Sequence, residues 1–166
     1  NVRFHQKDTL NRLFERLERK GLAVNRFRAD CGSCSDDIVE EVEKHCKTFY
    51  IRANRCTSLY NDIFALRGWK TEDINGIEFE LNSILAEKWK GKAYRLVIQR
   101  QKRMDGVLDL WEGEYTYRCI LTNDYESSMR EIVEFYNLRG GKERIFDDMN
   151  NGFGLDRLPK SFMAEN

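Results

Sequence analysis

The sequence predicts an α/β fold in which a set of antiparallel strands interrupts the core. Two strand-like segments, 24–29 and 48–53, flank an amphipathic helix, and this βαβ pattern is typical of a parallel sheet. Shorter strand-like segments, separated by turns that carry glycine, occupy much of 69–123. A helical pattern follows them, so we expect one α/β core that contains a β-rich insertion.

The first helix and strand are predicted from side-chain spacing. Leucines and a phenylalanine recur at helical intervals over Lys7–Lys20, and Gly21 suits the end of a helix. Alternating side chains from Val24 to Ala29 then predict a strand that ends just before Asp30. Ligand sites of open α/β sheets gather at the carboxyl ends of strands, so Asp30 is a candidate site residue.

A second helix and strand complete the βαβ unit. Ser35 and the two aspartates after it can cap and stabilise the first turn of a helix that continues to about His45. The segment Thr48–Ala53 is predicted to be the second parallel strand, reached by a right-handed connection. Residues 54–68 are expected to form a short helix and a turn.

From Trp69 onward the pattern is that of an antiparallel β insertion. It contains three strand-like stretches, Tyr94–Ile98, Leu108–Trp111 and Tyr115–Leu121, before Ser127–Ser128 introduces a helix. Basic side chains are frequent here, and they would suit DNA phosphates as well as a solvated sheet face. They are Lys88, Lys90, Lys92, Arg95, Arg100, Lys102 and Arg103.

The last predicted helix carries the most specific arrangement of polar side chains. Those that share one narrow arc beside an apolar stripe are Tyr136, Arg139, Glu143 and Asn150. One interpretation is an ordinary amphipathic helix in which Arg139 and Glu143 form an i,i+4 ion pair. The other is a functional face, since Gly140–Gly141 costs helix stability and would let a ligand approach the backbone. A helix break at the glycines is also compatible with the sequence.

The spacing Tyr-x2-Arg-x3-Glu resembles the C-terminal signature of DDE transposases from bacterial insertion sequences. Tyr136, Arg139 and Glu143 form this motif. Seven residues later, Asn150 stands where that family usually has lysine.

The resemblance extends beyond this motif. Phe27–Gly32 is similar to the segment around the family's second catalytic acid, and Gly152–Pro159 is similar to the continuation found in one branch. The resemblance implies an incomplete ribonuclease-H-like core. Its first part would be residues 1–68, followed by a β-rich insertion at 69–123 and by the core helix with the signature at 124–166.

The resemblance also implies metal-dependent DNA strand cleavage and strand transfer. In such chemistry two divalent cations, Mg²⁺ or Mn²⁺, are held by hard carboxylate oxygens. Asp30 and Glu143 match the family's second and third acids, so both are predicted to be catalytic metal ligands. Tyr136, Arg139 and Asn150 are predicted to contact transposon-end DNA.

The family's early strands and its first catalytic aspartate have no counterpart in this sequence. We therefore expect the C-terminal part of a transposase, inactive on its own because the metal site lacks one acid. The first core strand would keep an unpaired edge, which favours self-association. The alternative is a non-catalytic DNA- or protein-binding remnant of a transposase.

Composition narrows the classes further. Lys plus Arg and Asp plus Glu number 28 each, so the overall charge does not indicate a general nucleic-acid binder. The sequence has no membrane-length apolar run and no signal-peptide pattern, so we expect a cytoplasmic protein without a membrane partner. The five cysteines are then expected to be thiols. Cys31–Cys34 has redox spacing and His45–Cys46 could bind zinc, but buried or incidental thiols are the favoured interpretation.

Overall fold

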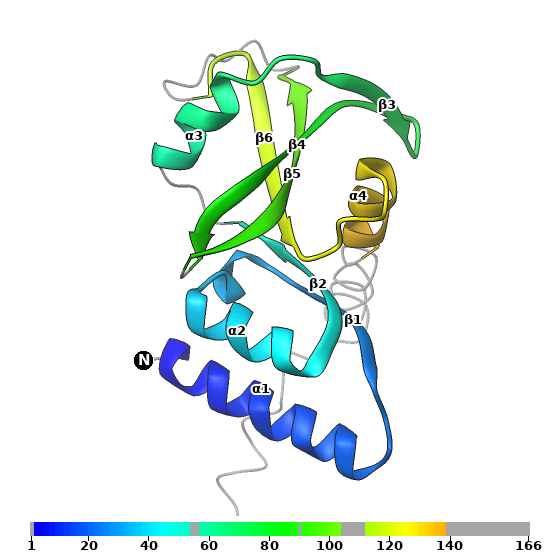
Figure 1. Cartoon of the computed structure of the whole chain (residues 1–166). Coiled ribbons are helices and arrows are strands. Elements are labelled where there is room, and N and C mark those ends of the chain that lie inside the picture. Colours follow the sequence, from blue (N-terminus) through cyan, green and yellow to red (C-terminus); the bar gives the residue numbers. More distant parts are fainter. Residues whose placement is uncertain (1, 54–56, 90, 104–111, 139–166) are drawn as a thin grey trace, which may run out of the picture. The chain divides into compact units, whose positions relative to one another are not determined.

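The computed structural model describes residues 2–53, 57–89, 91–103 and 112–138 (Figure 1). The chain divides into two compact units, Asn1–Tyr136 and Asn137–Asn166, and the fold below is that of the first. The strands are β1 (Val24–Ala29), β2 (Cys46–Arg52), β3 (Lys70–Ile74), β4 (Ile77–Trp89), β5 (Lys92–Lys102) and β6 (Tyr115–Thr122). The helices are α1 (Val2–Arg19), α2 (Asp36–His45), α3 (Thr57–Phe64) and α4 (Met129–Asn137), with a short 3₁₀ helix η1 at Cys31–Ser33.

Within the described residues, six strands form one sheet in the order β1-β2-β6-β5-β4-β3. β1 and β2 are parallel, and their register pairs Arg28 with Tyr50. The other neighbouring strands are antiparallel. β6 pairs with β2 as well as with β5, so strands of the predicted insertion continue the sheet of the βαβ unit. The mixed α/β class is therefore confirmed.

The βαβ unit has the predicted elements with small differences at their ends. β1 covers Val24–Ala29, as predicted. β2 begins at Cys46 rather than Thr48, because α2 passes directly into the strand and the Cys46 N–H still donates to the Val42 carbonyl. Ser35 occupies the cap position of α2, but its side chain makes no capping hydrogen bond.

The β3–β4 hairpin was missed by the strand pattern. Its two-residue turn is Asn75–Gly76, with φ of 57° and 78°, and it brings Ile74 opposite Ile77. Positive φ at both central residues is the geometry of a type I′ hairpin, for which Asn-Gly is a favoured pair. The Asn-Gly dipeptide between two isoleucines was the available sequence signal. Of the strands that the sequence did predict, Tyr94–Ile98 lies in β5 and Tyr115–Leu121 in β6, whereas 108–111 lies outside the described residues.

Both faces of the sheet are covered by helices (Figure 1). Alternation along β2 sends Phe49 and Ile51 to the side of α1 and α2, and Tyr50 to the side of α4. On the first face the helices contribute Phe14, Ile38, Val39 and Val42 to the core. On the second face α4 contributes Ile132 and Val133.

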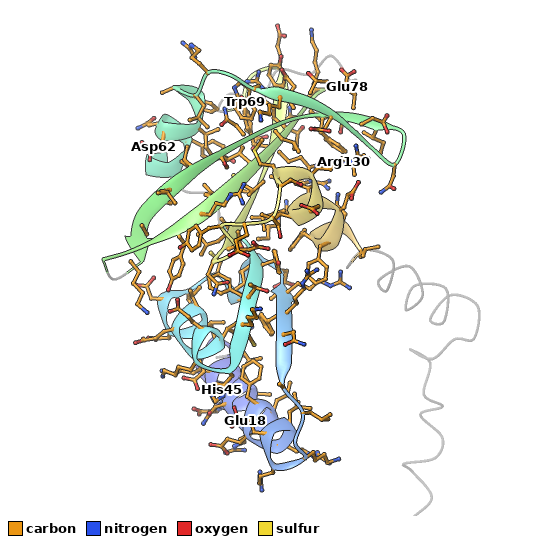
Figure 2. The ribbon with its side chains drawn as sticks, turned by 45° about the vertical axis from the view of Figure 1, so that its right-hand side comes forward. Glu18, His45, Asp62, Trp69, Glu78 and Arg130 are labelled. Atoms are coloured by element: carbon orange, nitrogen blue, oxygen red, sulfur yellow. The ribbon has the colours of Figure 1, made fainter. Side chains whose placement is uncertain are left out.

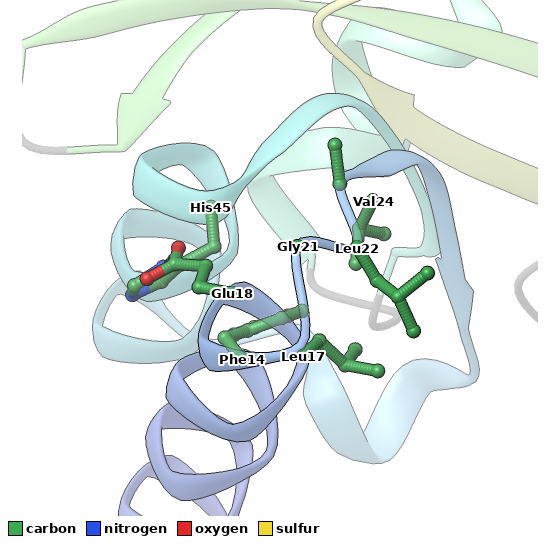
Figure 3. Close-up of a pocket in the computed structure, with 8 residues that line it drawn as sticks. Phe14, Leu17, Glu18, Gly21, Leu22, Val24 and His45 are labelled. Atoms are coloured by element: carbon green, nitrogen blue, oxygen red, sulfur yellow. Dashed lines mark hydrogen bonds and ion pairs between the residues drawn. The ribbon is translucent and has the colours of Figure 1, made fainter.

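α1 is fastened to α2 by a buried aromatic ring and a histidine. The ring of Phe14 stacks on that of His45, with centroids 4.9 Å apart. His45 places Nδ1 2.7 Å from a Glu18 oxygen and Nε2 3.3 Å from a Glu41 oxygen. Figure 3 shows Glu18 and His45 facing each other at a pocket of about 270 Å³, which Phe14 also lines. Only the imidazolium can donate hydrogen bonds through both ring nitrogens.

This arrangement predicts a pH-dependent attachment of α1. The hydrogen bond to Glu18 is the main cause that raises the pKa of His45; burial opposes it and Glu41, itself paired with Lys44, supports it. Because the folded pKa lies above the unfolded value of about 6.5, the stabilisation is complete below that pH and is lost as pH rises through the folded pKa. The free energy of unfolding should therefore fall as pH rises through the folded pKa of His45. The expected change is only about 0.5 to 1 kcal/mol, because Glu18 is exposed and its charge is screened.

Urea unfolding of the wild type and of His45→Gln between about pH 6 and about pH 9 measures this effect. His5→Gln is the matched control, because the other histidine is exposed on α1. An unchanged pH slope in His45→Gln would show that the imidazole does not hold the two helices together.

In the β-rich part of the sheet, Arg100 of β5 contacts two aromatic rings and a carboxylate. Arg100 places Cζ 4.0 Å from the centroid of the Trp69 ring and 4.2 Å from that of Tyr115. Its Nε and Nη2 donate to the two carboxylate oxygens of Glu80 at 2.8 and 3.3 Å. Trp69, labelled in Figure 2, is thereby fixed against β5. These contacts place one guanidinium over two aromatic rings and hold Trp69, the residue before β3, against β5.

Candidate active site

Asp30 stands at the carboxyl end of β1, where the sequence predicted a site. Its backbone is still extended, with φ −80° and ψ −176°, so the alternation of the strand places Asp30 on the same face as Arg26 and Arg28. The carboxylate accepts a hydrogen bond from the Gly32 N–H at 3.1 Å. A Cβ at Gly32 would lie 3.1 Å from Oδ1 of Asp30, so glycine leaves room for the carboxylate to fold over the turn.

α4 begins with a well-formed cap on this same face. The Ser128 N–H donates to Glu131 at 2.8 Å, and the Glu131 N–H donates back to the Ser128 hydroxyl at 3.2 Å. This reciprocal pair is a capping box, which satisfies backbone groups that the helix leaves unpaired. Arg130 of α4, labelled in Figure 2, also places Nη1 3.7 Å from a carboxylate oxygen of Glu72 in β3. The start of α4 is thus fixed by its capping box and by this contact with β3.

The last turn of α4 lies against β1. Nη1 of Arg28 donates to the Phe135 carbonyl at 2.6 Å. The guanidinium carbons of Arg26 and Arg28 are 5.2 and 5.0 Å from the centroid of the Phe135 ring, and the Tyr50 ring is 4.8 Å away. Side chains of β1 and β2 therefore hold Phe135 in place. One of them, Arg28, lies two residues before Asp30 on the same strand.

Of the five predicted site residues, two fall within the described part of the chain. Tyr136 is half-buried at the end of α4 and packs against the core cluster on that face. Asp30 is exposed. Arg139, Glu143 and Asn150 lie outside the described residues, so their predicted roles stay predictions.

The described residues contain no group of three or more His, Cys, Asp or Glu side chains close enough to hold a metal ion. Asp30 supplies a carboxylate of the hard-oxygen type that Mg²⁺ and Mn²⁺ prefer, and it does so at an exposed strand end. The donor chemistry of Asp30 fits the predicted cofactor. The second predicted ligand, Glu143, lies beyond the described residues.

Asp124 is a buried carboxylate that was not among the candidate site residues predicted from the sequence. It accepts hydrogen bonds from the Tyr50 hydroxyl at 2.7 Å and from the N–H groups of Glu126 and Ser127 at 3.2 and 3.0 Å. Burial alone would raise the pKa of Asp124, but these hydrogen bonds, that of Ser127 foremost, lower it to about 2. Its oxygens are occupied by the protein, so Asp124 ties the β6–α4 connection to β2 and is no candidate ligand.

The basic residues of the insertion are mostly used within the protein. Lys92 pairs with Glu43, Arg95 donates to the carbonyls of Asp124 and Ser127, Arg100 pairs with Glu80, Lys102 with Glu114 and Arg103 with Glu112. The side chains of Lys88 and Lys90 lie outside the described set. These interactions favour a structural role for the charges over the predicted DNA surface.

The cysteines are thiols in the described residues. Cys31 is exposed and Cys34 half-buried, whereas Cys46 and Cys119 are buried. Burial raises the pKa of Cys46 to about 11, and the neighbouring His45 is committed to two carboxylates. A zinc site at His45–Cys46 would need a thiolate and a free imidazole nitrogen, so this alternative is not supported.

In the part of the chain that the structure describes, no helix combines the length and apolarity needed to cross a membrane.

Comparison with known proteins identifies the family. A family model described as "Transposase DDE domain" matches residues 3–164, which is nearly the whole chain. Comparisons with curated proteins and with solved structures gave no significant match. The matched range includes Asp30 and the Tyr-x2-Arg-x3-Glu motif. The chain therefore belongs to the transposase DDE domain family.

Proposed function

We propose that this chain acts in DNA transposition as part of a metal-dependent catalytic domain that cleaves and joins DNA strands. The observation that carries the proposal is Asp30 at the carboxyl end of a parallel strand, on the face where the last turn of α4 is held. This is where open α/β sheets present their ligand sites. Membership of the transposase DDE domain family supports the reaction class.

In the proposed site, Asp30 and Glu143 would provide carboxylate oxygens to a pair of Mg²⁺ or Mn²⁺ ions. When bound, the ions would supply activation of a water or a 3′-hydroxyl and stabilisation of the leaving oxygen. Asp30 is orientated by its hydrogen bond from the Gly32 N–H. Tyr136, Arg139 and Asn150 contact transposon-end DNA, Arg139 through the planar fork of its guanidinium. The described residues supply one acid of this constellation; the remainder rests on the family resemblance.

The architecture assigned from the resemblance is also a proposal. Residues 1–68 and 124–166 would belong to a ribonuclease-H-like core, and 69–123 would be an insertion. The parallel β1–β2 pair with α2 between them supports the first part. β1 pairs with β2 alone among the described strands, so its other edge is open to a further strand or to self-association.

The test measures Mn²⁺ binding by electron paramagnetic resonance. The wild-type chain should reduce the signal of free Mn²⁺, and Mg²⁺ should compete, because both ions prefer oxygen ligands. Asp30→Asn and Glu143→Gln should each abolish this binding, since each removes one charged ligand. Asp36→Asn is the matched control, because Asp36 is an exposed aspartate in the first turn of α2.

Equal Mn²⁺ binding by the wild type and Asp30→Asn would exclude Asp30 from the site. Carboxyl groups of Asp30 and Glu143 more than ~10 Å apart in a crystal structure would exclude a shared, closely spaced metal pair. Either result would leave the non-catalytic binding remnant as the better description.

A further inference from the structure

We infer that Arg26 and Arg28 on β1 form a phosphate-binding site for the DNA backbone beside Asp30. The two side chains lie on one face of the strand, and both guanidinium carbons are within 5.2 Å of the Phe135 ring centroid. The inference rests on the proposed function, because it assigns DNA as the source of the phosphate. Arg26 and Arg28 lie outside the Tyr-x2-Arg-x3-Glu motif.

The site is preorganised by α4. Phe135 provides an aromatic surface for both guanidinium groups, which favours cations electrostatically. Arg28 is half-buried and uses Nη1 for the Phe135 carbonyl at 2.6 Å, so its position is fixed. A guanidinium has five N–H donors, and this single bond leaves others for a ligand. Arg26 is exposed at the same ring.

Neither Arg26 nor Arg28 forms a salt bridge with any carboxylate in the described residues, in contrast to Lys92, Arg100 and Arg103 of the insertion. Arg26 contributes to lowering the pKa of Glu131, but hydrogen bonds from Ser128 are the larger causes and hold that carboxylate in the capping box.

Two residues apart on a strand, the Cα atoms of the two arginines lie about 6.6 Å apart along its axis. Both guanidinium groups lie within 5.2 Å of the same ring centroid, so their like charges repel, and an anion between or above them would relieve the repulsion. The guanidinium fork matches the geometry of a phosphate group, so a phosphodiester suits this pair. Asp30 follows on the same face, so a DNA strand bound here would pass directly beside the proposed metal ligand.

The experiment measures binding of the full chain to a short fluorescent DNA duplex by anisotropy, in EDTA and at several salt concentrations. Arg26→Gln should weaken binding about 3- to 10-fold at low salt and reduce the slope of log K against log salt by about 0.9, the value for one phosphate contact. Arg26→Lys should retain most of the slope, because it keeps the charge. Arg12→Gln is the matched control: it removes an equal charge from the exposed side of α1, on the opposite face of the sheet.

Arg28→Gln should have the same effect on DNA and should also reduce stability, since Arg28 holds the Phe135 carbonyl; Arg26→Gln, at an exposed position, keeps the test independent of folding. Equal losses in Arg26→Gln and Arg12→Gln would overturn the inference, and so would a wild-type chain that does not bind DNA. Poly-glutamate competing as well as DNA at equal charge would show a general polyanion surface instead. EDTA removes the metal, so failure of the Asp30 test with Mn²⁺ is read separately from failure here.

Discussion

Asp124→Ala is expected to lower the free energy of unfolding by about 3 kcal/mol. Asp124 is only 7% exposed and accepts hydrogen bonds from the Tyr50 hydroxyl and from two backbone N–H groups. Removing a buried acceptor leaves its donors without partners, and each unpaired group costs about 1 to 3 kcal/mol. Urea unfolding at neutral pH measures the change.

The ionisation of Asp124 also predicts how the stability of the protein depends on pH. Its folded pKa of about 2 lies below the ordinary aspartate value of 3.8, so its contribution to stability is present above the unfolded pKa and is lost as pH falls through the folded pKa. The difference corresponds to about 2 kcal/mol. Asp124→Asn should remove this part of the acid dependence. An acid transition of unchanged slope in Asp124→Asn would show that other carboxylates cause it.

Phe14→Ala is expected to cost about 3 to 4 kcal/mol, near the usual range for a large buried ring. Phe14 is 2% exposed, stacks on His45 and meets the edge of Phe27 at 6.0 Å between centroids. Among the α1 side chains that the structure describes, Phe14 is the one that is fully buried. Its truncation therefore opens a cavity where α1 packs on α2. Thermal and urea unfolding of the variant measure the loss.

Leu13→Ala is the matched control for Phe14→Ala. Leu13 is the preceding residue on the same helix, but 48% of its surface is exposed, so its truncation should cost less than about 1 kcal/mol. Similar costs for the two substitutions would mean that α1 is not anchored through Phe14.

The elements near β1 could be predicted because their signals are local. Alternation predicted Val24–Ala29, and Ser128, one of the two serines expected to introduce a helix, caps α4. Asp30 could likewise be placed at a strand end from the sequence. Each of these inferences depends on residues within a few positions of one another, and such patterns survive in the folded chain.

The remaining contacts depend on residues far apart in sequence. Tyr50 and Asp124 are separated by 74 positions, so nothing local to Asp124 indicates that its carboxylate is buried. Arg28 and Phe135 are 107 positions apart, and their contact follows only once the side of the sheet covered by α4 is known. The strand β3 was missed because its residues Lys70–Asp73 are polar, as an edge strand permits.

The pairing of β6 with both β2 and β5 bears on how this protein can be altered. An inserted segment that formed its own sheet could be shortened or exchanged without disturbing its host. Here β6 supplies backbone hydrogen-bond partners to β2, through Tyr50, Ile51 and Arg52. Deleting 69–123 would therefore leave the backbone groups on the β6-facing edge of β2 without hydrogen-bond partners and would expose buried side chains such as Ile51. The segment 69–123, which resembles an insertion in the sequence, thus contributes β6 to the central sheet. Its length can vary only at positions that leave β6 paired with β2.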